Sequence, residues 1–346
     1  DRFEQYDINI DRPRPLVPRF LRLPVRERMD CTGRVLLPLD EDDVRAAVPV
    51  LQEHGVESVA IGYLHAFVNP EHEQRTAELL TAALPGVSIT LASEVCPEIR
   101  EFERLSTACA NAYVRPLMAR YLERLDVELR DRGLACPFLL MTSGGGLTTL
   151  ETASRFPIRL VESGPAGGAI LAQEVARQSG MDRLLSFDMG GTTAKLCLID
   201  DFQPLTSRSF EVDRVYRFKK GSGLPVRIPV IEMVEIGAGG GSIADIDKMG
   251  RIRVGPESAG SEPGPACYGL GGDRPTVTDA DVRLGRLYAP RFAGGELELD
   301  PGAVDRVLQD GIGGPMGLDL DMAAFGLAEV VDENMANAAR VHAVEN

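Results

Sequence analysis

Along this chain of 346 residues, the apolar residues have the spacing of a helix in some segments and that of a strand in others. A helix is expected to begin at Asp40, because the acidic residues after it would lie in the first turn and complement the helix dipole. Strand-like and helix-like segments then follow one another up to residue 141, which is typical of an α/β layer fold. The expected elements are a strand at 58–64, a helix at 71–84, a strand at 87–91, a helix at 98–132 that ends before Gly133, and a strand at 138–141.

Beyond these elements, a helix is followed by several closely spaced strands. The segment 161–170 is expected to be a strand end that runs into a helix, since Pro165 is well placed just inside a helix start. Tight turns then separate the apolar runs, which predicts consecutive strands. We expect strands at 184–187, 195–200, 205–212, 231–236 and 243–247, and helices at 279–287 and 334–342.

This change of pattern predicts two domains with a boundary near residue 160. Residues 1–38 are rich in Arg and Pro and show no helical or strand periodicity, so an extended connector is expected there. Residues 39–160 would be the remainder of a first α/β domain, and residues 161–346 would form most of a second one.

The turn after the strand at 184–187 is the strongest candidate for chemistry. Successive glycines let backbone N–H groups approach an anion closely, and such N–H groups form an anion-binding nest to which threonine hydroxyls add donors. Asp188, which ends the strand, is expected to hold Mg²⁺ through water opposite the same phosphates. The alternative is a plain hairpin turn without a ligand. The residues expected to bind the nucleotide here are Gly190, Gly191, Thr192 and Thr193.

Two further glycine-rich segments are candidates for the same anion. Gly239, Gly240 and Gly241, called the glycine loop below, follow the strand at 231–236 and are expected to cradle phosphates. A Rossmann fingerprint is excluded there, because the residue after the loop is not glycine and a strand-like pattern follows it.

Gly167 and Gly168 lie at the start of the helix expected near 163–176. They either face the nucleotide at a helix N-terminus or let the helix pack closely against the sheet.

Composition and charge narrow the possible partners. The chain has 37 Lys and Arg against 52 Asp and Glu, a net charge of −15. No basic excess is present to neutralise nucleic-acid phosphates or an acidic membrane surface, so neither is an expected partner. No apolar run approaches the roughly 20 residues of a membrane span. The six cysteines form no CxxC pair, which predicts reduced, mostly buried thiols in a cytoplasmic protein.

For several other conspicuous residues we expect a structural role. His72 is expected to be a residue of a helix start, because no HExxH or other ligand spacing accompanies it. Cys267 lies in a Gly- and Pro-rich loop where it could be exposed, although inert packing is more common. Asp279 and Asp281 are expected to cap a helix. A solvated loop is expected for the one basic cluster, Arg214, Arg217, Lys219 and Lys220.

Several segments together resemble the ATP-dependent hydantoinase/oxoprolinase family, which belongs to the actin-like ATPase superfamily. The resemblance covers nearly the whole chain, and its longest run is the most specific. The segments are Arg100–Arg104, Asn111–Val114, Ser143–Gly146, Ser163–Gly168, the hairpin that begins at Asp188, and the run Gly255–Gly269.

This resemblance implies a fold class and an activity. The fold would be α/β, with actin-like ATPase (ribonuclease H-like) domains whose mixed sheets are flanked by helices. ATP and Mg²⁺ would be the cofactors, and Asp188 would be the catalytic and metal-binding residue. The protein would phosphorylate the carbonyl oxygen of a cyclic amide of the hydantoin or 5-oxoproline type so that the ring opens. A second hydantoinase-type subunit or domain would be its partner.

Three alternatives stay open at this point. The chain could serve a ketone carboxylase, an actin-like small-molecule kinase, or a nucleotide-responsive assembly module. Members of the family usually carry an earlier Asp-x-Gly-Gly-Thr hairpin as well, and this chain has a single such motif at 188–192. The resemblance therefore implies a middle fragment that lacks half of the nucleotide cleft, with little or no turnover by itself.

Overall fold

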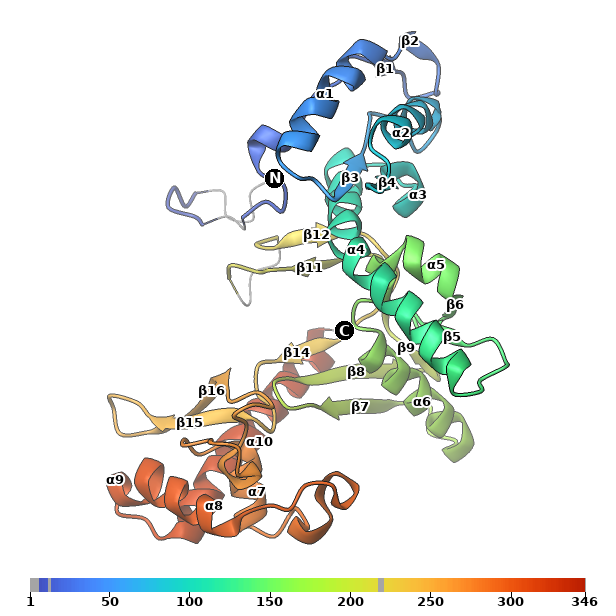
Figure 1. The fold of residues 1–346 in the computed structure, drawn as a ribbon. Coiled ribbons are helices and arrows are strands. Elements are labelled where there is room, and N and C mark those ends of the chain that lie inside the picture. Colours follow the sequence, from blue (N-terminus) through green and yellow to red (C-terminus); the bar gives the residue numbers. More distant parts are fainter. Residues whose placement is uncertain (1–5, 12–13, 217–220, 346) are drawn as a thin grey trace. The chain divides into compact units, whose positions relative to one another are not determined.

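The computed structural model describes residues 6–11, 14–216 and 221–345. The chain falls into two compact units: unit 1 comprises Asp1–Ile170 and Thr206–Ile231, and unit 2 comprises Leu171–Leu205 and Glu232–Asn346. Each unit combines helices with small sheets (Figure 1), so the expected mixed α/β class is confirmed.

In unit 1, the helix expected near Asp40 is present as α1 (Glu41–Glu53). The Asp40 carboxylate accepts the backbone N–H groups of Asp42 and Asp43, and this cap explains where the helix begins. β3 (Ser58–Ile61) and β4 (Ser88–Leu91) pair in parallel, and α2 (Glu71–Ala83) connects them. The core between these elements consists of Val44, Leu51, Ile61, Leu80, Leu84 and Leu91.

β3 ends earlier than the expected strand at 58–64, at the residue where its partner β4 also ends, and α4 packs against Gly62 directly after it. A β-carbon at Gly62 would collide with the side chain of Leu105. α4 (Glu101–Asp131) is the long helix that the sequence predicts, and Gly133, with φ of +90°, follows its end. Its buried Arg104 donates to the carbonyl groups of Glu98 at 2.8 Å and Tyr63 at 2.9 Å, which fastens the helix to the end of β3.

The remaining elements of unit 1 are short. In the segment expected to be an extended connector, the described residues include a 3-10 helix at Arg19–Leu21 and an antiparallel pair of strands. Met29 on the first of these strands is only 1 % exposed, so this segment contributes to packing. The short elements are β1 (Arg28–Met29), β2 (Val35–Leu37), α3 (Ala92–Val95), β5 (Leu139–Met141), β6 (Leu147–Thr149), α5 (Leu150–Arg155), β10 (Thr206–Ser207), β11 (Phe210–Val212), β12 (Leu224–Val226) and β13 (Val230–Ile231).

No strand end precedes α6 (Ser163–Ser179), which corrects the expectation for 161–170. The 3-10 helix Pro157–Leu160 leads into it instead. The N–H of Val161 donates to the Ile158 carbonyl and Glu162 has φ of +61°, so the backbone turns where an extended segment was expected.

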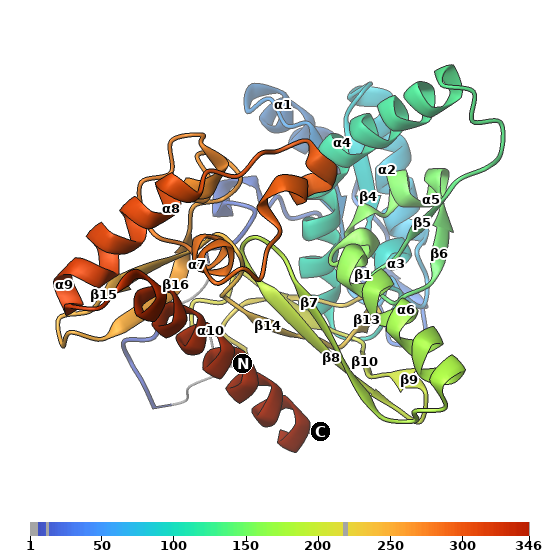
Figure 2. The same ribbon diagram turned by 90° about the horizontal axis from the view of Figure 1, so that it is seen from below.

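Unit 2 contains an antiparallel sheet whose strands have the order β14–β8–β7, and Figure 2 shows β7 and β8 side by side. α10 packs against β8, β14 and β16, and the core includes Leu196, Ile236, Leu308 and Leu327. The elements are β7 (Leu184–Met189), β8 (Ala194–Asp200), β9 (Gln203–Pro204), β14 (Val234–Ile236), β15 (Ser242–Ile246), β16 (Ile252–Ser258), α7 (Val277–Arg283), α8 (Pro301–Leu308), α9 (Gly314–Met316) and α10 (Leu320–Glu345), together with 3-10 helices at Ala266–Tyr268 and Ala289–Gly295 and a π-helix at Gln309–Gly313.

Two expected strands are divided in the structure. The segment 205–212 contains β10 and β11, and the segment 231–236 contains the end of β13 and then β14. β10 pairs with β13 and β11 pairs with β12, all in unit 1, whereas β14 pairs with β8 in unit 2. The strands are broken because their halves pair with different partners.

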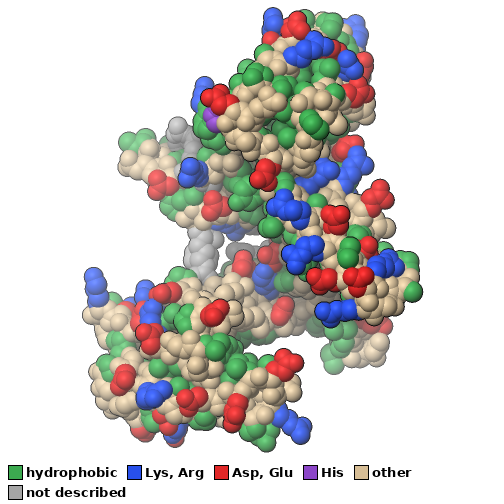
Figure 3. Space-filling model, viewed as in Figure 1, with side chains coloured by type: hydrophobic (Ala, Val, Ile, Leu, Met, Phe, Trp, Pro, Cys, Tyr) green, Lys and Arg blue, Asp and Glu red, His purple; other side chains and the backbone are tan. Residues whose placement is uncertain are grey.

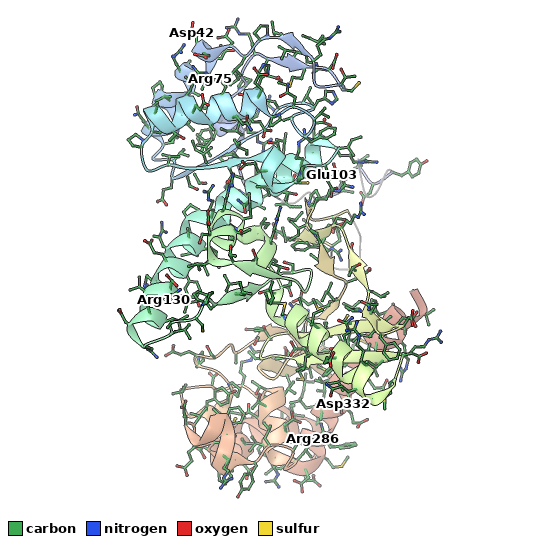
Figure 4. The ribbon with its side chains drawn as sticks, turned by 90° about the vertical axis from the view of Figure 1, so that its right-hand side faces the viewer. Asp42, Arg75, Glu103, Arg130, Arg286 and Asp332 are labelled. Carbon is green, nitrogen blue, oxygen red and sulfur yellow. The ribbon has the colours of Figure 1, made fainter. Side chains whose placement is uncertain are left out.

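Charged side chains of both signs are interspersed on the face shown in Figure 3. Many of them form ion pairs; Arg286, labelled in Figure 4 with Asp332, lies 3.7 Å from the Asp332 carboxylate and 3.3 Å from Asp281. Of the basic cluster, Arg214 pairs with Glu211, and residues 217–220 lie outside the described residues. None of the helices in the described part of the chain is both long and apolar enough to cross a membrane.

Candidate functional site

The residues between β7 and β8 form a hairpin turn with unused donors. The N–H of Gly190 donates to the Thr193 carbonyl at 2.9 Å. Within the described residues, the N–H groups of Gly191, Thr192 and Thr193 have no hydrogen-bond partner, nor do the two threonine hydroxyls. Gly191 and Thr192 are also exposed. Free donors on successive residues are what an anion-binding nest requires.

The carbonyl groups of the turn explain why these donors stay free. In a closed two-residue hairpin turn, the Gly190 carbonyl would accept the N–H of Thr193. Here it accepts the N–H of Gly240 at 3.0 Å instead, and the Gly191 carbonyl accepts the N–H of Gly241 at 2.6 Å. The glycine loop therefore occupies the carbonyl groups of the turn and leaves its N–H groups available.

The backbone of the turn does not itself require glycine. Neither Gly190 nor Gly191 has φ in the left-handed region, although the favoured two-residue hairpin turns need it. A β-carbon at Gly191 would meet no atom within 4 Å, and one at Gly190 would meet only the Thr193 carbonyl oxygen at 3.6 Å. Open space thus lies beside the free N–H groups, and a ligand can approach them.

The glycine loop needs its glycines for a steric reason. A β-carbon at Gly239 would lie 2.7 Å from the Gly190 carbonyl oxygen and 2.7 Å from the backbone nitrogen of Thr192. The N–H of Gly239 donates to the Ser242 hydroxyl at 2.8 Å. All three amides expected to cradle phosphates therefore have partners within the protein, and the loop supports the turn from behind.

Asp188 lies beside this turn on β7. Its side chain is exposed and has no hydrogen-bond or ion-pair partner among the described residues. The strand register places Lys195 opposite it on β8 and Glu235 opposite Lys195 on β14, and the Lys195 ammonium lies 3.9 Å from the Glu235 carboxylate. Carboxylate, ammonium and carboxylate thus lie in one row across three strands.

Sequence reasoning missed Lys195 and Glu235 as members of the site. Lys195 could have been predicted, because the four-residue turn of the hairpin brings it opposite Asp188. Glu235 was not, because its position depends on which strand lies next to β8.

A single exposed carboxylate fits the way Mg²⁺ binds to nucleotides. Mg²⁺ usually keeps several waters and takes one or two protein carboxylates together with substrate phosphates. In the described part of the chain, no three His, Cys, Asp or Glu side chains form a group that could hold a metal ion by themselves. Asp188 is therefore suited to a metal that arrives with the phosphates.

The two glycines on α6 lie in unit 1. A β-carbon at Gly168 would meet nothing within 4 Å, and one at Gly167 would be in ordinary contact with Met141 at 3.8 Å. Close packing therefore accounts for neither glycine in the described structure. Their role at the nucleotide stays a prediction.

Among the residues for which the sequence predicts a structural role, Asp279, Cys267 and His72 have well-defined contacts. Asp279 takes part in the capping box of α7 as predicted, whereas Asp281 lies within that helix and does not cap it. The Asp279 carboxylate also accepts the backbone N–H of Cys267 at 2.8 Å. The Cys267 side chain is fully buried, contrary to the possibility of exposure; burial and the nearby Asp279 raise the pKa of its thiol, so it is no reactive nucleophile. His72 is buried, with its Nδ1 2.9 Å from a Glu27 carboxylate oxygen.

Two family models match this chain. The model described as hydantoinase/oxoprolinase matches residues 104–346, which is more than half of the chain. The model described as hydantoinase/oxoprolinase N-terminal region matches residues 1–84.

Individual proteins are similar over almost the whole chain. The chain is 37 % identical over 341 residues to the caprolactamase subunit alpha of Pseudomonas jessenii, a match that covers 99 % of this chain and 48 % of the relative. The crystal structure of ATP-dependent caprolactamase from that organism has a TM-score of 0.72 and 36 % identity, and the match covers 97 % of this chain and 47 % of that one.

A second solved structure is that of nucleotide-free acetone carboxylase. Its TM-score is 0.77 at 26 % identity, and the match covers 92 % of this chain and 44 % of that one. The chain thus spans about half the length of the curated relatives it matches.

Proposed function

The chain belongs to the hydantoinase/oxoprolinase family, and from this premise we propose that the protein is the ATP-dependent component of an enzyme that opens a cyclic amide. The γ-phosphoryl group of ATP moves to the carbonyl oxygen of the ring, and ADP leaves. Water adds to the activated carbon, and the C–N bond breaks as the ring nitrogen takes up a proton. A second water releases phosphate and leaves a carboxylate.

The free N–H groups of the turn carry this proposal. Three successive donors at Gly191, Thr192 and Thr193, with open space beside Gly191, suit the phosphates of a nucleotide. In phosphoryl transfer, positioning and neutralisation of charge supply most of the rate. We assign the turn to the phosphates and the glycine loop to the support of the turn.

Asp188 is proposed as the residue that holds Mg²⁺ through water. When bound, Mg²⁺ would neutralise the charge that develops on the transferring phosphoryl group. Lys195 lies directly opposite Asp188 on the neighbouring strand, so its ammonium would lie on the same side of the sheet as the Asp188 carboxylate.

The finer assignments from the sequence are part of this proposal. We propose that the fold is of the actin-like ATPase type, with domains at 39–160 and 161–346, and that Gly167 and Gly168 face the nucleotide. We also propose a second hydantoinase-type subunit as the partner, because the caprolactamase relative is named as a subunit. Six cysteines, all free, agree with a reducing compartment such as the cytoplasm.

A ketone carboxylase is the second candidate function. The similarity of this chain to the acetone carboxylase structure, with a TM-score of 0.77, supports it. In that reaction the same ATP-dependent activation would act on the oxygen of a ketone, and a carbon–carbon bond would form.

Product analysis separates these candidates. The full-length protein, purified with its partner subunit, is incubated with MgATP and a panel of cyclic amides and of ketones with bicarbonate. We expect ring-opened acid, ADP and phosphate in equal amounts. A carboxylated ketone supports the second candidate, and a stable phosphoester supports a small-molecule kinase. ADP formation that no ring compound stimulates would contradict the proposed function.

A further inference from the structure

The start of α7 lies directly behind the glycine loop. The backbone N–H and the hydroxyl of Thr278 both donate to the Gly240 carbonyl, each at 2.8 Å. The N–H of Gly240 in turn donates to the Gly190 carbonyl. A continuous series of hydrogen bonds thus connects the first turn of α7 with the hairpin turn.

The same turn of α7 is itself held firmly. The fully buried Asp279 carboxylate accepts the N–H groups of Ala266 at 3.2 Å and Cys267 at 2.8 Å, in addition to the N–H and hydroxyl of Thr276. The run Gly255–Gly269 reaches the glycine loop a second time, because the N–H of Ala259 donates to the Gly241 carbonyl at 2.8 Å. The glycine loop is therefore supported at two successive carbonyl groups.

We propose that Thr278 is a positioning residue for the nucleotide, which acts through Gly240 on the hairpin turn. This inference rests on the proposed function. Its hydroxyl fixes the peptide plane between Gly240 and Gly241, so that the loop keeps the Gly190 and Gly191 carbonyl groups occupied and the turn N–H groups free. A shift of the loop by a few tenths of an ångström would let the turn close on itself, with the Gly190 carbonyl accepting the N–H of Thr193.

Close packing around the Thr278 hydroxyl means that another donor cannot easily take its place at the Gly240 carbonyl. A β-carbon at Gly240 would lie 2.8 Å from the Thr278 hydroxyl oxygen, so helix and loop are in close contact. Thr278 is 7 % exposed, and water cannot easily replace its hydroxyl as a donor. Valine has nearly the shape of threonine without the hydrogen bond, whereas serine keeps the hydroxyl.

Three variants of the full-length protein with its partner subunit test this inference. They are Thr278→Val, Thr278→Ser and, as a matched control, Thr76→Val, which removes another buried threonine hydroxyl from a 2.9 Å hydrogen bond with Tyr63 in unit 1. The probe is MgATP, whose Kd is measured by calorimetry alongside Tm.

We expect Thr278→Val to raise the Kd for MgATP about tenfold, which corresponds to one lost directional interaction. Thr278→Ser is expected to stay within about twofold of the wild type, and so is Thr76→Val, even where its Tm falls equally. A Kd for Thr278→Val equal to that of the wild type would overturn this inference and leave the proposed function unaffected. If Thr278→Val does not fold, a tenfold weaker binding by folded Thr278→Ser would overturn it. An absence of MgATP binding by the wild type would overturn both this inference and the proposed function.

Discussion

Replacement of Gly239 by alanine is expected to abolish most of the ATP-dependent activity. The added β-carbon would lie 2.7 Å from the backbone of both Gly190 and Thr192, and neither backbone group can rotate away as a side chain could. The loop or the turn must move, which would separate the Gly240 and Gly241 donors from the carbonyl groups they occupy. Overpacking of this kind costs about 1–3 kcal/mol of stability. Misplacement of a catalytic element by about 1 Å lowers turnover roughly 10²-fold.

The measurement is kcat for ADP formation together with Tm, on the full-length protein with its partner subunit. Gly164→Ala on α6 is the control for Tm, since an added methyl there meets nothing within 4 Å. We expect its Tm to be unchanged or slightly higher, because alanine favours a helix more than glycine does. Wild-type turnover by Gly239→Ala would contradict the docking of the loop on the turn.

Asp188→Asn is expected to lower kcat about 10²- to 10³-fold, by analogy with the loss of one oxyanion-hole donor from an acyl-transfer site. Asparagine has the same shape but no negative charge for a metal ion. The carboxylate is exposed and has no partner among the described residues, so its replacement leaves packing intact. We therefore expect stability to change by less than about 0.5 kcal/mol.

Asp200→Asn is the matched control for this substitution. Asp200 is an exposed carboxylate at the other end of the same hairpin, where it pairs with Arg183 at 3.0 Å. Its replacement is expected to leave kcat unchanged. Equal kcat values for Asp188→Asn and Asp200→Asn would show that the Asp188 carboxylate has no role in turnover.

The hairpin could be predicted from the sequence because its determinants are local. An apolar strand, an aspartate and four small residues are consecutive in the chain, and the resulting turn pairs Asp188 with Lys195. The cap of α7 is local for the same reason, since Thr276 and Asp279 are three residues apart.

The docking of the glycine loop could not be predicted in the same way. Its donors are about fifty residues from the carbonyl groups they meet, and a run of glycines is equally compatible with a phosphate cradle and with close backbone packing. Hydrophobic periodicity likewise predicts one strand at 231–236. It does not indicate that the two halves of this segment pair with β10 and with β8.

The proposed function depends on phosphate binding by the turn between β7 and β8, and Gly191→Ala tests this binding. The backbone at Gly191 accommodates alanine, and the methyl group would enter space that no protein atom occupies. Gly146→Ala, in the turn between β5 and β6, is the control, because its methyl would meet only the Thr142 hydroxyl at 3.6 Å.

The decisive measurement is the Kd for MgATP of both variants and the wild type, with Tm recorded for each full-length protein. We expect Gly191→Ala to bind MgATP at least about tenfold more weakly, with an unchanged Tm, and Gly146→Ala to bind it normally. Wild-type affinity in a normally folded Gly191→Ala would mean that the turn only reverses the chain.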